Sequence, residues 1–378
     1  MKQIALLSSH ADIASSLKDY TLRRLSKIIT EHPSFACTVV SCDDFCLEEN
    51  AVSIKHGAIL NGDALVTASF DTPIRPDYVY FHSLTDIPNR HSQCLKLLTA
   101  LAERGVPVNY DADSSMMGIK SVLEYRCNEF HRESGLTIPR PRTLIFKANE
   151  EDRSKIVNFL RAGAPCILKP HNSSRARGVR ILVSEEQVPQ LILSDDIYVL
   201  QELLSNPMTV NGYKVSLRVY LAIRDLRRPT YAILGQGLLK CAVQPYMRGN
   251  PHAEIVGTSY AKRMGFTPMI HLFHDLNGSD ACLVPAWREI RSSIEQTLDV
   301  FMEAVSWRAG MFYKTLPSFL FWGVDIAVQC SEEGPKAYLI EVNTFPALYR
   351  NHTVTDNAMD REFIEELFAK AVIPSPWQ

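Results

Sequence analysis

The sequence predicts a mixed α/β protein, and three observations support that class. Residues 1 to about 112 alternate short apolar runs with helical segments, a pattern typical of an α/β region with a parallel sheet. From residue 139 onward, runs rich in β-branched and aromatic residues follow one another, which favours strands. Between residues 286 and 307, apolar residues recur at helical spacing. The 378 residues are enough for two or three domains with a sizeable core.

The N-terminal region contains two apolar runs, "QIALLS" and "DYVYFHS", that read as strands. The stretch "HSQCLKLLTALAERGVPVNY" predicts a helix with Leu95, Leu98 and Leu101 on one face, followed by a turn and a further strand. A second helix is expected over "DADSSMMGIKSVLEYRCNEFHRESG", which Gly135 can end. We therefore expect a first domain over residues 1–112 and a change of architecture after it.

The strand candidates of the second part are "PCILKPH", "GVRILVS", "IYVLQELL", "SLRVYLAIR", "PTYAILGQGLLKC", "FLFWGVDIAVQ" and "AYLIEVN". The helix predicted over 286–307 places Ile290, Ile294, Leu298, Phe301 and Val305 on one face, and another helix is expected around 360–371. The Pro- and Gly-containing stretch 242–256 predicts a mobile loop.

Composition excludes several classes of protein. The net charge of −2 gives no sign of a nucleic-acid binder, and no apolar run approaches the ~20 residues that a membrane helix needs. Nine cysteines, an odd number without a C-x-x-C pair, favour a reduced, cytoplasmic protein. The sequence also lacks the "GxxxxGK[ST]" phosphate loop and the "GxSxG" nucleophile elbow.

The stretch "YLIEVN" ends an apolar strand with a carboxylate and an amide, Glu341 and Asn343. Burial of a charge is costly unless the charge is paired or binds a metal. The two side chains lie on the same face, because strand residues alternate with a period of two. Two oxygen donors side by side suggest ligands for magnesium, and Asp325 in "FWGVDIAV" would join them if the two strands pair antiparallel.

Two lysines in the middle of the chain suggest contacts to phosphate. Lys120 lies early in the helix that Gly135 ends, and Lys169 ends a strand that "HNSSRARGVRIL" follows. Lysines far apart in sequence can neutralise phosphates from two directions. A loop of small residues with Gly178 can fold its backbone N–H groups over a triphosphate. The strand "YVLQELL" offers backbone groups to an adenine edge, and Glu202 or a nearby acid could accept the ribose hydroxyls. ATP with magnesium fits this set of groups.

These segments resemble a known family. The stretches "CILKPHNSSRARGVRI", "LQELLSNPMTVNGYKVSLRVYLAI", "GQGLLK", "FWGVDIAV" and "YLIEVNTFPAL", followed by "TDNAMDREFIEELF", span about 165 to 370. In this order they resemble the ATP-grasp superfamily and, within it, the tubulin-tyrosine-ligase-like enzymes. The combination NP…NGYKxxLRVY…EVN is the most specific part. The preceding stretch around Lys120 is similar to the corresponding part of glutathione-synthetase-like ligases, where a lysine reaches ATP.

The resemblance implies an ATP-grasp fold, in which two α+β subdomains, residues 113–204 and 205–378, clasp ATP after a Rossmann-like α/β domain at 1–112. It implies ATP and Mg²⁺ as cofactors, with the metal on Asp325, Glu341 and Asn343. Arg218 and Lys240 would stabilise an acyl phosphate. The nucleotide would be bound by Lys120, Lys169, Ser174, Arg177, Gly178 and Lys214, with Gln201, Glu202, Leu203 and Leu204 as the adenine hinge.

Three positions depart from the family's pattern. Ser216 stands where the family usually has Asp, two residues before the arginine of its "KFDLR" motif. Lys240 stands where the family has Arg, which keeps the charge but loses the bidentate geometry. The Asn of the family's "HLTN" segment has no clear match in "AEIVGTSYA".

The expected function is that of an ATP-dependent carboxylate–amine ligase acting on an amino acid, a peptide or a protein tail. A carboxylate would attack the γ-phosphate to give an acyl phosphate and ADP, and an amine would then displace phosphate. No general base is obvious, and Glu254 is the first acid to consider. Two alternatives stay open: an ATP-grasp kinase that phosphorylates a polyol or sugar hydroxyl, and a protein that binds ATP without turnover.

Overall fold

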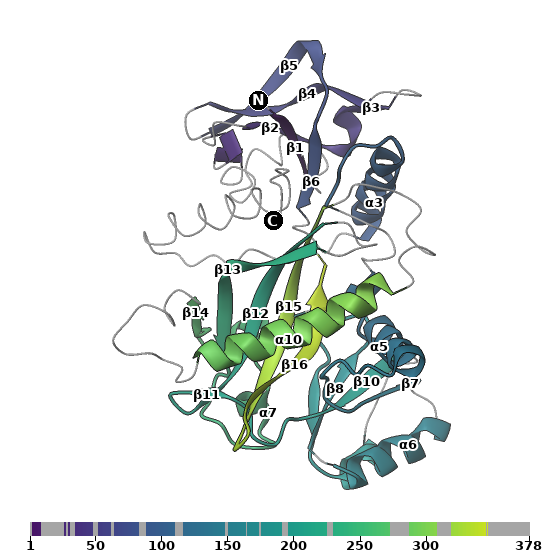
Figure 1. Cartoon of the computed structure of the whole chain (residues 1–378), viewed down its shortest axis with the longest axis vertical. Coiled ribbons are helices and arrows are strands. Elements are labelled where there is room, and N and C mark those ends of the chain that lie inside the picture. Colours follow the sequence, from purple (N-terminus) through teal and green to yellow (C-terminus); the bar gives the residue numbers. More distant parts are fainter. Residues whose placement is uncertain are drawn as a thin grey trace.

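The computed structural model describes residues 2–8, 26–27, 29–30, 35–47, 52–61, 64–82, 88–109, 116–147, 150–163, 165–173, 175–190, 196–224, 230–272, 287–307, 319–344 and 346. These residues form three β-sheets with helices packed on them (Figure 1). The architecture is mixed α+β, as the sequence predicts. The helix expected around 360–371 lies outside the described residues.

The N-terminal sheet consists of β1 Lys2–Ser8, β2 Phe35–Val40, β3 Phe45–Leu47, β4 Val52–Asn61, β5 Ala64–Ile74 and β6 Tyr78–His82. Its order is β3-β4-β2-β1-β6, with β5 paired to β4. β1 runs parallel to β2 and to β6, and the other pairs are antiparallel. The predicted strands β1 and β6 are confirmed, and the predicted parallel pairing holds for the centre of the sheet. The likeness to a Rossmann domain stays a prediction.

The helix α3, Pro88–Glu103, covers the N-terminal sheet. Its residues Leu98 and Leu101 are fully buried and pack with Leu7 of β1 and Val79 of β6. Two of the three leucines predicted on one face therefore lie in the core, where burying a leucine side chain contributes about 1.5–3 kcal/mol; the Leu95 side chain lies outside the described residues.

The middle sheet has the order β7-β10-β8-β9 and is antiparallel throughout. Its strands are β7 Thr143–Lys147, β8 Cys166–Pro170, β9 Arg180–Leu182 and β10 Ile197–Glu202. One face packs on α6, Glu150–Arg161, through a core that includes Ile156, Leu160, Leu168 and Leu200. Since strand side chains alternate, the neighbours of these core residues point to the other face.

The helix α5, Lys120–Ser134, follows the short 3-10 turn η2, Met116–Gly118. It ends at Gly135, whose φ of 75° is left-handed and whose N–H donates to the carbonyl of His131. The predicted end of this helix is confirmed, because glycine adopts such a φ without a steric penalty. Lys120 is its first residue.

The C-terminal sheet has the order β14-β13-β12-β15-β16, with β11 paired to β12. Its strands are β11 Thr209–Val210, β12 Tyr213–Arg224, β13 Thr230–Cys241, β14 Ile270–Leu272, β15 Phe319–Ser331 and β16 Gly334–Asn343. The helix α10, Trp287–Ser306, crosses one face of this sheet (Figure 1). The helix predicted over 286–307 is therefore confirmed, and all five of its apolar positions are buried.

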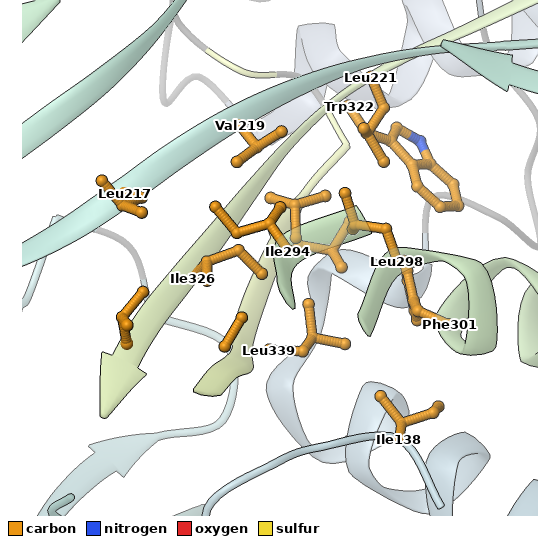
Figure 2. Packing of buried hydrophobic residues seen from close by; sticks show 14 of the residues in the cluster. Ile138, Leu217, Val219, Leu221, Ile294, Leu298, Phe301, Trp322, Ile326 and Leu339 are labelled. Atoms are coloured by element: carbon orange, nitrogen blue, oxygen red, sulfur yellow. The ribbon is translucent and has the colours of Figure 1, made fainter. Parts of the chain in front are cut away.

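Figure 2 shows how α10 packs on the sheet. Leu217 and Val219 of β12 and Ile326 of β15 face Ile294 and Leu298 of the helix. This side of the sheet is the largest apolar core of the described residues. The strand residues between these positions must point to the opposite face, and that face carries the polar groups of the candidate site.

The remaining short elements are η1 Cys42–Asp44, η3 Glu185–Gln190, α7 Pro251–Glu254 and α8 Thr258–Arg263. The helices of the described residues include none that is both long and apolar enough to span a membrane. The cysteine side chains that the structure describes are free thiols.

Candidate functional site

Charged side chains gather on the face of the C-terminal sheet that is turned away from α10. Arg218 on β12 lies directly opposite Asp325 on β15. Lys240 on β13 lies opposite Ser216, one step along the same face of β12. Three neighbouring strands therefore bring an arginine, a lysine and an aspartate to one place.

These three residues form a compact ion network. Arg218 donates from Nε to Asp325 Oδ1 over 2.5 Å and from Nη2 to Oδ2 over 2.8 Å. Lys240 Nζ donates to Asp325 Oδ1 over 3.0 Å. Burial alone would raise the pKa of Asp325, but the positive charges of Arg218 and Lys240 outweigh it and hold the pKa well below its usual range. Burial lowers the pKa of Lys240, and the Asp325 charge opposes that shift.

Gly323 makes room for the arginine. A Cβ atom at this position would lie 2.8 Å from Arg218 Cδ and 2.7 Å from Pro346 Cβ. Such contacts are closer than van der Waals distance, so a larger residue would push Arg218 away from Asp325. The glycine of "FWGVDIAV" thus has a packing role that only the paired strands show.

A β-bulge aligns Glu341 with this face. Asp325 pairs with Glu341, but the next residue, Ile326, pairs with Leu339, so that Ile340 is the extra residue on β16. Before the bulge Leu339 faces the core, and after it Val342 does. Without the extra residue, strand alternation would turn Glu341 toward α10. The predicted convergence of Asp325 and Glu341 on paired antiparallel strands is confirmed.

The three candidate metal ligands have the chemistry that magnesium prefers. Asp325 and Glu341 are cross-strand partners, and Asn343 pairs with Gly323 two residues before the aspartate. Asn343 Nδ2 donates to the carbonyl of Gly323 over 3.3 Å, which fixes the amide and turns Oδ1 away from that carbonyl. Asp325 accepts three hydrogen bonds from Arg218 and Lys240, so Glu341 and Asn343 offer the more accessible oxygens. Two carboxylates and an amide fit a hard divalent cation.

Lys169 lies on the face of the middle sheet that is turned away from α6. Its Nζ donates to Gln201 Oε1 over 3.0 Å, and Gln201 Nε2 donates in turn to Thr143 Oγ1 over 3.3 Å. Within the described part of the chain, no carboxylate forms a salt bridge with this buried lysine. Burial lowers the pKa of Lys169 to about 8. The positive charges of Lys120, Arg140 and Lys214 also lower this pKa, whereas the negative charge of Glu341 raises it.

Lys120 lies between the two sheets. Its backbone N–H donates to the carbonyl of His171, and its Nζ donates to the carbonyl of Ser173 over 2.6 Å. Nζ also lies 3.9 Å from Glu341 Oε2. Ser121 Oγ and His171 Nδ1 are 3.0 Å apart, which ties the start of α5 to the end of β8. Lys120 is therefore held both at the loop that follows β8 and beside Glu341, one of the candidate metal ligands.

Lys214 forms a salt bridge with Glu254. Its Nζ donates to Glu254 Oε2 over 2.6 Å, and Glu254 Oε1 accepts the N–H of Gly249 over 3.1 Å. The Glu254 side chain has no exposed surface. This geometry assigns Glu254 to the lysine and the backbone, and it does not favour the general base that the sequence suggested.

The stretch 242–256, expected as a mobile loop, is folded onto β12. It contains α7, whose start Asn250 caps by accepting the N–H of His252. The carbonyl of Gly212 accepts the N–H of Tyr246 over 2.7 Å. Pro and Gly indicate turns in this segment, and the buried Lys214–Glu254 pair attaches it to β12. Its mobility and its closure on a ligand stay predictions.

The expected adenine hinge is engaged in contacts within the protein. Glu202 Oε2 accepts from Arg142 Nε over 3.1 Å, and the N–H of Glu202 donates to the carbonyl of Arg142. The N–H of Leu203 donates to the carbonyl of Pro165. The Gln201 side chain holds Lys169. A hinge role for Gln201 to Leu204 stays a prediction.

The loop between β8 and β9 carries the remaining phosphate candidates. Gly178 has a left-handed φ of 70°, and a Cβ there would lie 2.8 Å from Pro170 Cγ, so the turn requires glycine. The carbonyl of Arg177 accepts from Ser173 Oγ over 3.1 Å. Ser174 lies outside the described residues. Phosphate contacts of this loop stay a prediction.

The position that departs from the family's aspartate, Ser216, is tied to the backbone: its Oγ donates to the carbonyl of Ile326 over 3.4 Å. It lies on the site face opposite Lys240. Arg218 and Lys240 share Asp325, and the aspartate expected here from the family resemblance would add a second carboxylate to this face.

Sequence reasoning missed the buried pair Arg140–Glu124. Arg140 donates from Nε and Nη2 to Glu124 Oε2, over 3.1 and 2.7 Å. Glu124 lies one turn after Lys120 on α5, and the carbonyl of Pro139 accepts the N–H of Leu339. The pair therefore joins α5 to the segment beside β16. Its only sequence signal is a carboxylate on the apolar side of the helix, which by itself indicates no partner.

Comparisons with known proteins point to one family. A profile of the tubulin-tyrosine ligase family matches residues 131–377. The human protein named "Probable tubulin polyglutamylase TTLL2" is 24% identical over 217 residues, which are 53% of this chain and 34% of that protein. "Tubulin polyglutamylase ttll-4" of Caenorhabditis briggsae is 24% identical over 262 residues, 63% of this chain and 40% of that protein. Human "Tubulin polyglutamylase TTLL7" is 26% identical over 113 residues, 29% of this chain and 12% of that protein.

The chain thus spans at most about two fifths of the length of these curated relatives. The family profile covers the middle and C-terminal sheets, with all the strands that bring Lys169, Arg218, Lys240, Asp325 and Glu341 together. This chain belongs to the tubulin-tyrosine ligase family, and with it to the ATP-grasp superfamily.

Proposed function

We propose that this protein is an ATP-dependent carboxylate–amine ligase that forms an amide through an acyl phosphate, with release of ADP and phosphate. The observation that carries the proposal is the surplus of buried positive charge around Lys169. This lysine, Lys120, Lys214, Arg218 and Lys240 are cationic and mostly buried. Buried charges need a partner. An anion with several charges, such as a triphosphate, would supply one to Lys169, which has no carboxylate partner among the described residues, and would share Arg218 and Lys240 with Asp325.

Each cation has a role that its position suggests. Lys169 and Lys120 would bind the nucleotide phosphates from the middle sheet. Arg218 and Lys240 would stabilise the negative charge on the transferring phosphoryl group and on the tetrahedral intermediate that follows. Both of them already bind Asp325, so the bound reactants would share these donors with the aspartate. The protein would act by position and charge, without a covalent nucleophile.

Magnesium fits Glu341, Asn343 and Asp325, and when bound it would supply positive charge to the phosphates. Lys120 Nζ lies 3.9 Å from Glu341 Oε2, so the lysine and a metal ion held by these ligands would bind the same anion.

The relatives suggest the class of substrate. Their names describe tubulin polyglutamylases, which supports a peptide or protein tail as the carboxylate donor and an amino acid as the amine. The domain scheme of an N-terminal unit at 1–112 and two subdomains, 113–204 and 205–378, clasping ATP is part of the same proposal. The sheets give it support, because the middle and C-terminal sheets turn their charged faces toward Lys120, which contacts both.

Trapping with hydroxylamine tests the reaction type. The full chain is incubated with ATP, magnesium and a panel of acidic peptides and amino acids, and products are read by mass spectrometry. An acyl phosphate is a reactive electrophile, so we expect a hydroxamate of the peptide carboxylate and one ADP for each hydroxamate. A stable phosphorylated alcohol without hydroxamate would support the kinase instead. ATP binding without ADP release on any substrate would support the protein that binds ATP without turnover.

A matched pair of variants sharpens this test. Lys240→Ala should reduce hydroxamate formation if the lysine stabilises the acyl phosphate or the step that leads to it. Lys336→Ala, on β16 but in contact with the Tyr338 ring rather than with Asp325, should leave it unchanged. Equal rates for the two variants would contradict the role of Lys240.

A further inference from the structure

The loop between β8 and β9 has an unusual backbone. Arg175 and Ala176 have left-handed φ values of 60° and 54°, and Gly178 has one of 70°. Only glycine adopts such values without a steric penalty, so the two residues with side chains need support from outside the loop.

Arg263, the last residue of α8, supplies that support. Its Nη1 donates to the carbonyl of Arg175 over 3.2 Å, and its Nη2 donates to the carbonyl of Ala176 over 2.9 Å. The planar guanidinium suits two adjacent acceptors, which a lysine could not engage in the same way. The guanidinium carbon also lies 5.6 Å from the centre of the Tyr260 ring.

Tyr260 is itself fixed on the protein. It is buried, it forms a small apolar cluster with Ile255 and Ile181, and Ala176 packs against this cluster. Tyr260 Oη lies 3.1 Å from His252 Nδ1. Arg263 thus lies against a buried, hydrogen-bonded tyrosine while its donors hold the loop.

The other end of the loop is held by Lys120, whose Nζ donates to the carbonyl of Ser173. In a planar trans peptide, the C=O and the next N–H point in opposite directions. The carbonyls drawn toward Arg263 therefore direct the N–H groups of Ala176 and Arg177 away from Arg263. A run of N–H groups pointing one way is an arrangement that suits an anion.

We propose that Arg263 is a positioning residue that fixes the β8–β9 loop in the conformation that receives the nucleotide phosphates. The proposal rests on the proposed use of ATP and adds a residue that contacts no substrate. It links α8, through two carbonyls, to the loop that follows Lys169. Loss of the guanidinium would free Arg175 and Ala176 to leave the left-handed region, and the N–H groups would lose their common direction.

The test uses the full chain with Arg263→Ala, Arg263→Lys and, as matched control, Lys262→Ala, an exposed cation next to it on α8. Binding of a non-hydrolysable ATP analogue with magnesium is measured by calorimetry. Two charge-assisted hydrogen bonds are lost in Arg263→Ala, so we expect the dissociation constant to rise about tenfold. Arg263→Lys should fall between this variant and the wild type, and Lys262→Ala should match the wild type.

Limited proteolysis without nucleotide separates the loop from the ligand. Cleavage by trypsin after the exposed residues Arg175 and Arg177 should be faster in Arg263→Ala than in wild type and Lys262→Ala, because a loop that leaves its fixed conformation enters a protease more readily. Unchanged cleavage, or analogue binding within about twofold of wild type, would overturn the positioning role. If the wild-type chain binds no nucleotide, the proposed function fails, and the proteolysis experiment still decides whether Arg263 holds the loop.

Discussion

The buried cations of the candidate site have different partners on the C-terminal sheet and on the middle sheet. On the C-terminal sheet, Arg218 and Lys240 are paired with Asp325 in a network with good geometry. On the middle sheet, Lys169 is equally buried but is bonded to the neutral amide of Gln201. On the C-terminal sheet, each of these cations has a carboxylate partner before any ligand arrives, whereas on the middle sheet Lys169 has none among the described residues.

The difference shows where an anion gains most. Burial makes the charged form of Lys169 unfavourable. An anionic ligand that binds there compensates for this desolvation cost. A ligand at Arg218 must share donors that Asp325 already holds, so it gains less in binding. We infer that the middle sheet supplies most of the nucleotide affinity, whereas the C-terminal sheet supplies stabilisation of the transition state.

Asp325→Asn should give the largest effect. It removes the charge that pairs with two buried cations, so we expect the free energy of unfolding to fall by about 3 kcal/mol. Turnover should fall by about a thousandfold, because Arg218 and Lys240 lose their common anchor. Denaturant unfolding and ADP release measure the two effects.

Glu341→Gln is the control for this variant, because Glu341 is partly exposed. It should also stop turnover, since an amide is a weaker magnesium ligand than a carboxylate, but the free energy of unfolding should stay within about 0.5 kcal/mol of wild type. Near-normal ADP release by Glu341→Gln at low magnesium would contradict the metal assignment. An Asp325→Asn protein as stable as wild type would contradict the ion network.

Lys169→Met should separate stability from binding. Affinity for the ATP analogue should fall by tenfold or more, an effect of about 1.4 kcal/mol or more. At pH 7 the free energy of unfolding should rise by about 2 kcal/mol, because a buried cation that has no carboxylate partner among the described residues is replaced by an apolar side chain of similar length. Calorimetry and denaturant unfolding give the two numbers, and Lys96→Met, at an exposed position of α3, is the control.

The gain in stability should depend on pH. The pKa of Lys169 is about 8 in the folded protein and 10.5 is its ordinary value. The unfolded chain therefore binds more protons between these values, and wild-type stability should rise relative to Lys169→Met as the pH increases through that range. The advantage of the methionine variant should therefore shrink from pH 8 upward. An advantage that is constant across this range would mean that Lys169 is not perturbed.

Nucleotide affinity should show the opposite trend with pH. Lys169 is mostly charged at pH 7 and mostly neutral at pH 9, so the dissociation constant of the ATP analogue should rise by up to about tenfold between them. Lys169→Arg keeps its charge throughout and should lose most of this dependence. The pKa of Lys240 is also lowered, so a smaller slope should remain. Equal slopes in wild type and Lys169→Arg would assign the titration to another group.

Glu202→Gln should give the smallest effect. Its carboxylate binds Arg142 in the structure, so we expect the affinity for the ATP analogue to change by less than about twofold. A larger loss, with unchanged stability, would restore the ribose-binding role that the sequence suggested. Isothermal titration with ATP and with its 2′-deoxy analogue would show whether a ribose hydroxyl is involved.

The sequence by itself determined the elements and the chemistry of the site. The spacing of Ile290, Ile294 and Leu298 specified a helix with one apolar face, and the structure buries that face. Gly135 specified where α5 ends. The carboxylate and amide that follow the apolar run "YLI" pointed to a site, because polar groups within an apolar strand need a partner, although the structure leaves both side chains half-buried.

Only the tertiary structure decided which charges meet. The pairing of β12 with β15 selected Asp325 as the partner of Arg218, and no local pattern encodes a contact between residues about a hundred positions apart. The bulge at Ile340 set the face of Glu341, although alternation from Leu339 would have placed it in the core. The contacts of Glu254 with Lys214 and of Arg263 with the β8–β9 loop form only when one segment folds onto another. Sequence patterns report the periodicity of one element, whereas partners are set by the packing of elements that are distant in the chain.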